Sequence, residues 1–135
     1  MENDYIVAKF NQQGHLISLY DKNEVRELIP KGQAGNKLQL YDDIPLYWDA
    51  WDVEMYHLNT GKDAGTAKAK IGEVGPLRAT LVVKHALTAN STAVQTIVLT
   101  ASSPRLDFHT EVEWHENRVL LVRIPIRREM YFLRT

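Results

Sequence analysis

The sequence predicts an all-β protein, an antiparallel β-sandwich, on three observations. Residues 105–114 alternate strictly between apolar and polar side chains, which places Leu106, Phe108, Val112 and Trp114 on one face of a strand. No segment longer than about two helical turns shows the 3.6-residue apolar period of an amphipathic helix. Short apolar runs instead follow one another between turn sequences, which is typical of sheets packed face to face. Trp114 completes an apolar face, so we expect it in the core.

The N-terminal third of the chain is predicted to begin with a β-hairpin. Residues 5–10 are rich in β-branched and aromatic side chains, and residues 15–20 form a second such run. The turn-type sequence of residues 11–14 joins the two runs. Residues 24–29 are predicted to form one helical turn, which a Pro-Lys-Gly sequence then stops. A short strand over 37–41 follows.

The C-terminal half is predicted to hold the main strands of the sandwich. A polar, glycine-bearing loop over 59–65 precedes an edge strand over 66–74. Strong strands follow over 77–87 and 92–101, and the second is rich in Thr and Val, as expected of a central strand. The last strand is predicted over 119–126. In the strands 77–87 and 119–126, the side chains predicted to face inward are Leu77, Ala79, Leu81, Val83 and Leu87, and Leu120, Val122, Ile124 and Ile126.

Length and composition indicate one globular domain without a strong charge. The chain has 135 residues, of which 44% are apolar and 24% charged, and its net charge is −1. A chain of this size can bury a core without metal or disulfide crosslinks, and the absence of cysteine excludes disulfides and thiolate metal sites. No apolar run approaches the length of a membrane span, and no signal peptide is visible. The charge balance gives no basis for binding nucleic acid or an anionic membrane, so we expect neither as a partner.

Residues 41–56 differ from the strand-and-turn sequence around them. They hold two of the three tryptophans, three of the six tyrosines and four aspartates. Flat rings that stack on sugar faces, beside carboxylates that accept hydroxyl hydrogen bonds, are typical of a carbohydrate site. Alternatively, the rings pack against another domain while the acids stay in water. The residues alone leave both interpretations open and favour the second slightly.

The titratable residues do not predict a catalytic or metal site. No two histidines have the spacing that places both on one helical face toward zinc. They are His15, His57, His85, His109 and His115. Glycosidases need two carboxyl groups, about 5–5.5 Å apart in retaining enzymes and about 6.5–9.5 Å apart in inverting ones. The candidate pairs are Asp42 with Asp43 and Asp49 with Asp52, which we interpret as turn and loop aspartates. We predict no catalytic residue and no metal ligand in this chain.

Parts of the sequence resemble a known enzyme family. Residues 35–43 (Gly-Asn-Lys-Leu-Gln-Leu-Tyr-Asp-Asp) and 45–52 (Pro-Leu-Tyr-Trp-Asp-Ala-Trp-Asp) are similar to the segment that follows the catalytic domain of glycoside hydrolase family 38 α-mannosidases, in particular the cytosolic branch. Residues 14–22 and 108–116 resemble the same region less specifically. The resemblance runs from about Tyr5 to Ile126.

This resemblance implies a domain division and a fold subtype. Residues 1–126 would be a β-sandwich portion of the α-mannosidase C-terminal region, of the galactose-mutarotase-like or supersandwich type, and residues 127–135 a divergent tail. Family members continue with more sheet, and their catalytic domain precedes this region. The chain is therefore expected to be a fragment with a truncated sandwich.

The resemblance also implies a function. The parent enzyme would hydrolyse terminal α-mannosides of oligosaccharides with retention, in mannose and oligosaccharide catabolism, with zinc or another divalent metal in its catalytic domain. This chain would be the scaffold and pocket rim beside the catalytic domain of the same polypeptide, inactive alone and cytoplasmic. The residues expected to contact substrate are Tyr47, Trp48, Asp49, Trp51 and Asp52. A stand-alone carbohydrate-binding β-sandwich and a non-catalytic interaction isoform remain as alternatives.

Overall fold

The computed structural model describes residues 1–48, 55–117 and 119–124. These residues are mostly strand, with η1 (Met55–Asn59) as a short 3-10 helix. The strands are β1 (Ile6–Phe10), β2 (Leu16–Asp21), β3 (Arg26–Glu27), β4 (Lys37–Asp42), β5 (Lys62–Asp63), β6 (Thr66–Val74), β7 (Arg78–Ala86), β8 (Thr92–Thr100), β9 (Leu106–Glu113) and β10 (Val119–Ile124). Among the described residues no helix has the length and apolar character to cross a bilayer. The all-β prediction is confirmed.

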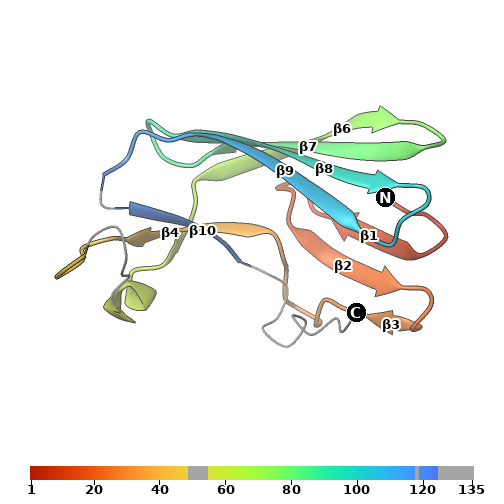
Figure 1. The fold of residues 1–135 in the computed structure, drawn as a ribbon, viewed down its shortest axis with the longest axis horizontal. Coiled ribbons are helices and arrows are strands. Elements are labelled where there is room, and N and C mark those ends of the chain that lie inside the picture. The colour runs from red at the N-terminus through yellow and green to blue at the C-terminus, as the bar shows by residue number, and fades with distance from the viewer. Residues whose placement is uncertain (49–54, 118, 125–135) are drawn as a thin grey trace.

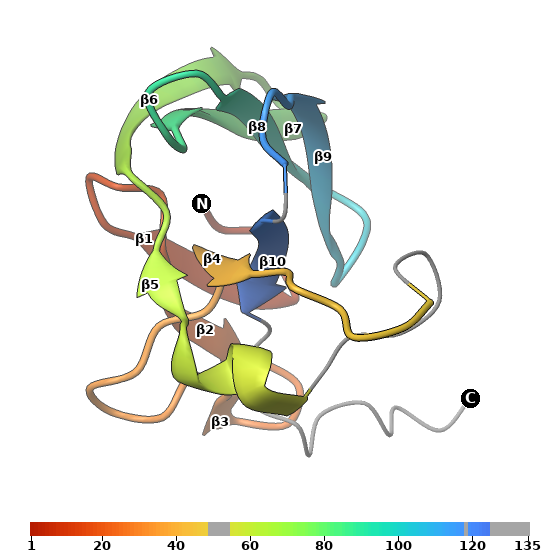
Figure 2. The same cartoon turned by 90° about the vertical axis from the view of Figure 1, so that its left-hand side faces the viewer.

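The strands form antiparallel sheets in two layers (Figures 1 and 2). The upper layer in Figure 1 is a four-stranded sheet with the order β6-β7-β8-β9. The lower layer holds two three-stranded sheets, β1-β2-β3 and β10-β4-β5. Backbone hydrogen bonds between Leu16 and Gly35, with N–O distances of 3.0 and 2.9 Å, join these two sheets. The chain therefore folds as the predicted antiparallel β-sandwich.

The upper sheet follows the two-residue period of its sequence. Strand β8 lies between β7 and β9, and β6 is an edge strand, as predicted. The odd-numbered side chains of β8 point toward the lower layer and are buried, and these are Ala93, Gln95, Ile97 and Leu99. The even-numbered side chains face outward. This alternation separates an inner, buried face from an outer, solvated face of the same sheet.

Two apolar clusters lie between the layers. One contains the buried side chains Ala8, Leu16 and Ile29, against which Phe10, Leu19 and Leu106 pack. The other contains Leu38, Leu87 and Ala93, with Ala64, Trp114 and Leu121 packed against it. The prediction that Trp114 belongs to the core is confirmed. The two clusters together involve β1, β2, β4, β8, β9 and β10, so both layers contribute to the core.

A polar network also crosses between the layers. The Nδ2 amide of Asn36 donates to Gln95 Oε1 at 2.6 Å and to the carbonyl of Gly14 at 3.1 Å. Gln95 Nε2 donates in turn to Thr110 Oγ1 at 3.2 Å. Asn36 and Gln95 are both buried, at 3% and 0% exposed. Because a buried amide needs its hydrogen bonds, this network fixes how the β1–β2 turn sits on the upper sheet.

The structure corrects several predicted details. Residues 24–29 do not form a helical turn but contain β3, and the predicted loop over 59–65 contains β5. Val112, predicted on the dry face of β9, is 42% exposed. In β10, Leu121 packs against the buried cluster, although it was not among the side chains predicted to face inward. The side chains that were predicted there, those of Leu120, Val122, Ile124 and Ile126, lie outside the described part of the structure. Each difference arises from sheet pairing or sheet edges, which local alternation does not encode.

Candidate functional site

The candidate site is the connection between β4 and β5, which contains the aromatic and acidic residues singled out in the sequence. The chain leaves the sandwich where β4 ends at Asp42 and returns through η1 to β5, which pairs with β4 (Figure 2). The backbone N–H of Asp42 donates to Thr60 Oγ1 at 2.9 Å. Thr60 itself donates to the carbonyl of His57, from its backbone N–H at 2.9 Å and from its hydroxyl at 2.7 Å. These bonds close the base of the loop and hold η1 beside the end of β4.

The described part of this loop presents large apolar side chains to solvent. Tyr47 and Trp48, two of the predicted substrate contacts, are 77% and 74% exposed. Their exposed neighbours in the loop and in η1 are Ile44, Leu46, Met55 and Leu58. We call these six residues the apolar loop surface. A contiguous group of exposed apolar side chains is a common mark of a binding surface.

Trp48 also has an unusual backbone conformation. Its φ angle is +60°, in the left-handed region that large side chains seldom occupy. Such conformations are concentrated at binding sites. Each costs free energy, which favourable contacts elsewhere in the fold offset. The other predicted substrate contacts, Asp49, Trp51 and Asp52, lie outside the described residues. Their contact with substrate therefore stays a prediction.

Three aromatic residues that were not predicted to contact substrate link the described parts of the loop. The rings of Tyr41 and His57 meet edge to face, with centroids 5.4 Å apart. The hydroxyl of Tyr56 donates to the carbonyl of Ile44, which links η1 to the residues after β4. The two-residue alternation of β4 predicts that the side chain of Tyr41 points outward. Its contact with the His57 ring forms only because the chain returns beside β4 through η1.

A charged and hydrogen-bonded row lies beside the loop on the outer side of the lower layer. The hydroxyl of Tyr41 donates to Gln39 Oε1 at 2.7 Å, and Gln39 Nε2 donates to Asp63 Oδ1 at 3.1 Å. Lys37 Nζ lies 3.8 Å from Asp63 Oδ2. The hydrogen bond from Gln39, and next the charge of Lys37, lower the pKa of Asp63. Asp63 is therefore a carboxylate at neutral pH.

Lys37 and Asp63 of this row line a shallow groove together with Asn11 and His15. Burial, and next the charge of Lys37, lower the pKa of His15, so its imidazole is neutral at pH 7. Asn11 Nδ2 lies 3.3 Å from His15 Nδ1. If that amide donates, Nδ1 accepts and the proton of the neutral ring is on Nε2. The groove thus offers amides, an imidazole and a carboxylate for hydrogen bonding to a hydroxyl-bearing ligand.

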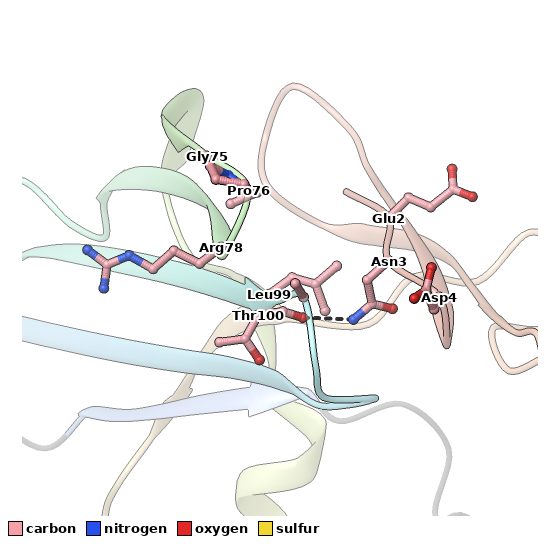
Figure 3. A pocket seen from close by; sticks show the side chains of 10 residues that line it. Glu2, Asn3, Asp4, Gly75, Pro76, Arg78, Leu99 and Thr100 are labelled. Atoms are coloured by element: carbon pink, nitrogen blue, oxygen red, sulfur yellow. Dashed lines mark hydrogen bonds between the residues drawn. The ribbon is translucent and has the colours of Figure 1, made fainter.

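A smaller crevice of about 150 Å³ lies where the N-terminal residues meet the upper sheet (Figure 3). Asn3 occupies it: its Nδ2 donates to the carbonyls of Thr100 and Ser103 at 2.8 and 2.7 Å. Figure 3 shows Asn3 directed at Thr100, while the side chains of Glu2 and Arg78 point away. This arrangement fastens the N-terminus to the sheet, and we assign the crevice a structural role.

The described residues offer no candidate metal centre. Within residues 1–48, 55–117 and 119–124, no three His, Asp or Glu side chains are grouped so that they could hold a metal ion. The carboxylates of the predicted pair Asp42 and Asp43 follow each other at the end of β4, with Asp42 exposed and Asp43 half-buried. The pair Asp49 and Asp52 lies outside the described residues.

Comparison with known proteins places the chain in a family. Residues 1–129 match the family described as glycosyl hydrolases family 38 C-terminal domain. Alpha-mannosidase 2C1 of Homo sapiens is 42% identical over 132 residues, which cover 94% of this chain and 12% of the relative. The Mus musculus protein of the same name is 41% identical over 132 residues, again 94% of this chain and 12% of the relative. Alpha-mannosidase G of Dictyostelium discoideum is 36% identical over 126 residues, or 90% and 12%.

The match agrees with the resemblance seen in the sequence. The chain spans about an eighth of the length of these relatives, or 12% of each. The matched range continues to residue 129, three residues past the predicted boundary at 126, so the division between sandwich and tail stays a prediction. The all-β fold, the antiparallel layers and the family match lead to the same conclusion: this chain belongs to the C-terminal domain family of the family 38 glycosyl hydrolases.

Proposed function

We propose that this chain is part of an α-mannosidase that hydrolyses terminal α-mannosides of oligosaccharides. In this proposal the chain is a scaffold and pocket rim beside the catalytic domain of the same polypeptide. Membership of the family and the α-mannosidase names of its relatives support the activity. The observation that supports the rim role is the apolar loop surface, with Tyr47 and Trp48 about three-quarters exposed. Large apolar side chains that are exposed to water commonly mark a surface that binds a partner.

The loop would contact both the oligosaccharide and the catalytic domain. We assign the sugar contacts to Tyr47, Trp48, Asp49, Trp51 and Asp52, because rings stack on pyranose faces and carboxylates accept hydroxyl hydrogen bonds. The aliphatic part of the apolar loop surface would pack on the catalytic domain. The hydrogen bonds of Thr60 and Tyr56 hold the described ends of this loop together, which supports a role as a pocket rim.

Bond cleavage would take place in the catalytic domain, outside this chain. A retaining glycosidase uses two carboxyl groups about 5–5.5 Å apart, one as nucleophile and one as acid and base. A zinc or another divalent metal in the catalytic domain belongs to the same proposal, on the resemblance to the family. The parent enzyme is proposed to be cytoplasmic, on the resemblance to the cytosolic branch.

The division of labour can be tested with a chromogenic α-mannoside. The pure 135-residue chain should release no chromophore, with or without added zinc or cobalt. Human alpha-mannosidase 2C1 serves as the positive control for the assay, since it is an α-mannosidase by name. Turnover by the chain alone would contradict the scaffold role, because it would place the catalytic carboxyl groups on these residues.

The exposed rings also favour a second candidate, a stand-alone carbohydrate-binding module. Titration with mannose oligosaccharides, followed by tryptophan fluorescence, separates the two. Saturable quenching that Trp48→Ala or Trp51→Ala abolishes, and that the core variant Trp114→Phe retains, would favour the module. A flat titration is the expected result, because a pocket rim completes a sugar site only together with the catalytic domain.

A further inference from the structure

The outer face of the upper sheet, which points away from the lower layer, carries its charges in a fixed order. Strand pairing places residues that are directly opposite each other on the same face. From β6 to β9 this outer face is formed by Thr66, Lys68 and Lys70; Val82, Lys84 and Ala86; Thr92, Val94, Thr96 and Val98; and Asp107, His109, Glu111 and Glu113. The inward neighbours of these residues include the buried Val83, Gln95 and Ile97, which confirms the direction of the face.

Positive charge lies on one side of this face and negative charge on the other. One row across the four strands reads Lys68, Lys84, Val94, Glu111. The next row reads Thr66, Ala86, Thr92, Glu113. Lysines therefore occupy β6 and β7, glutamates occupy β9, and small apolar or hydroxyl side chains lie between them.

Within the molecule these charges lack compensation. Lys68 lies directly opposite Lys84, and like charges in that arrangement destabilise a sheet. Among the ion pairs of the described residues, none involves these two lysines, Lys70, Glu111 or Glu113. At the ends of the same face, Arg78 pairs with Glu73 and Arg105 with Asp107. The central charges are thus available to a partner.

The shape of the outer face is also uneven. A shallow hollow lies over β6, β7 and β8, and its lining combines the small residues Thr66, Gly72, Ala86 and Thr92 with Lys68, Lys70 and Lys84. The exposed side chains of His109, Glu111 and Glu113 lie on β9, on the other side of the face. A face with a lysine-lined hollow on one side and exposed carboxylates on the other is complementary to itself in charge.

We propose that this outer face binds a second copy of the chain, in a twofold dimer whose axis runs parallel to the strands between β7 and β8. Rotation about that axis exchanges the two sides of the face and keeps each row at its own level. Lys68 of one copy then lies opposite Glu111 of the other, while Lys84 lies opposite Val94 and one strand away from Glu111. The hollow of each copy faces β9 of its partner. The apolar loop surface belongs to the lower layer and lies outside this contact (Figure 1).

The size of the face indicates a weak dimer. Four strands about 4.8 Å apart and about 30 Å long give a face of roughly 600 Å², somewhat below the roughly 800 Å² that each partner contributes to a standard stable interface. With charged rows at both edges, association should depend on ionic strength. The dimer should therefore form at high chain concentration in low salt and dissociate as salt is added.

Sedimentation velocity on charge-reversed chains tests the pairing. In low salt, the unmodified chain should approach twice the 15.5 kDa of the monomer. The double variants Lys68→Glu/Lys84→Glu and Glu111→Lys/Glu113→Lys should each be monomeric. An equimolar mixture of the two variants should form the dimer again, because each then supplies the charge that the other lacks. A matched control, Lys31→Glu/Lys62→Glu, reverses two exposed lysines of the lower layer and should dimerise like the unmodified chain.

Several results would overturn the proposal. They are a chain that stays monomeric at its highest soluble concentration in low salt, a dimer that survives both reversals, or a mixture of the variants that stays monomeric. A dimer that is lost in Trp48→Ser instead would place the contact on the apolar loop surface. Far-ultraviolet circular dichroism of each variant shows that the exposed substitutions leave the fold intact. These results are independent of the mannosidase assay, so the dimer and the proposed function can fail separately.

Discussion

His85 is a titratable side chain buried between the two layers. It lies on the inner face of β7 with Val83 and is 5% exposed, and its Nε2 has no hydrogen-bond partner among the described residues. Burial, and next the charge of His15, lower the pKa of His85. In the unfolded chain the pKa returns to about 6.5. As the pH falls, the unfolded state therefore takes up a proton first, and the free energy of unfolding decreases below about pH 6.5.

This pH dependence can be measured by urea denaturation at about pH 7.5 and 5.5. The unmodified chain should lose more stability over this interval than the variant His85→Leu, which cannot titrate at this position. The double variant His85→Leu/His15→Gln should lose still less, because the pKa of His15 is also lowered. An equal loss in the unmodified chain and in His85→Leu would show that His85 contributes no pH dependence.

Gln95 connects three elements through one buried side chain. Its carbonyl accepts from Asn36 and its amide donates to Thr110. The variant Gln95→Leu keeps a similar volume but leaves the Asn36 amide with one acceptor fewer in a buried site. We expect the free energy of unfolding to fall by about 1–3 kcal/mol, measured by urea denaturation. The control Thr96→Val, on the outer face of the same strand, should change it by at most about 0.5 kcal/mol.

At the scale of the elements, the β1–β2 turn packs closely against the upper sheet. Gly14 closes the β1–β2 turn with a φ angle of +78°, and a Cβ atom added there would lie 2.5 Å from Val83 Cγ2 on the upper sheet. Gly32 has nearly the same φ angle, +80°, but an added Cβ would meet nothing within 4 Å. The two glycines thus share the backbone requirement and differ in packing.

Alanine substitution at these two glycines separates the two effects. Gly32→Ala should destabilise the fold by about 1–2 kcal/mol, the cost of a left-handed conformation for a residue with a side chain. Gly14→Ala should cost about 1–3 kcal/mol more, because the new methyl group overpacks the interface with Val83. The double variant Gly14→Ala/Val83→Ala should cost less than the sum of its single variants. Additive costs would show that the turn does not pack on Val83.

The elements that could be predicted from the sequence are those whose pattern is local. The Thr- and Val-rich composition of β8 indicated its inner position in the sheet, and the alternation over residues 105–114 indicated that Trp114 belongs to the core. The buried face of β8 was not predicted, because it includes the polar Gln95 while Val94 faces outward. The strand β3 was missed because the side chains of Asp21 and Glu27 bind backbone N–H groups nearby and hold an extended turn where a helical one was expected. The strand β5 is defined by its pairing with Gln39 and Leu40 of β4. No local sequence pattern predicts that pairing.

The candidate site follows the same rule. Tyr47 and Trp48 lie in a segment without strand alternation, and both are exposed. Their contact with sugar stays a prediction. The contact of Tyr41 with His57 and the row from Tyr41 through Gln39 to Asp63 could not be predicted. Each of these contacts joins residues on the two sides of the loop and forms only when β5 pairs with β4.

At the scale of the whole molecule, side chains and turns of the described residues link the two layers at several places. Asn3 binds the carbonyls at the end of β8 and in the turn after it, Gly14 contacts Val83, and Asn36 binds Gln95. The apolar clusters likewise draw on both layers. Because these links are spread along the sandwich, we expect both layers to unfold in one cooperative transition.

Native-state hydrogen exchange on Leu16→Ala tests this cooperativity. Leu16 is 0% exposed on β2, and its truncation should cost about 2–5 kcal/mol. If the layers unfold together, the most protected amides of β7 and β8, in the opposite layer, should lose as much protection as those of β1 and β2. The control Ile17→Ala truncates a neighbour that is 46% exposed and should change protection little in either layer. Loss confined to β1 and β2 would show that the upper sheet is stable without the lower layer, and the crossing contacts would then contribute to alignment of the layers more than to stability.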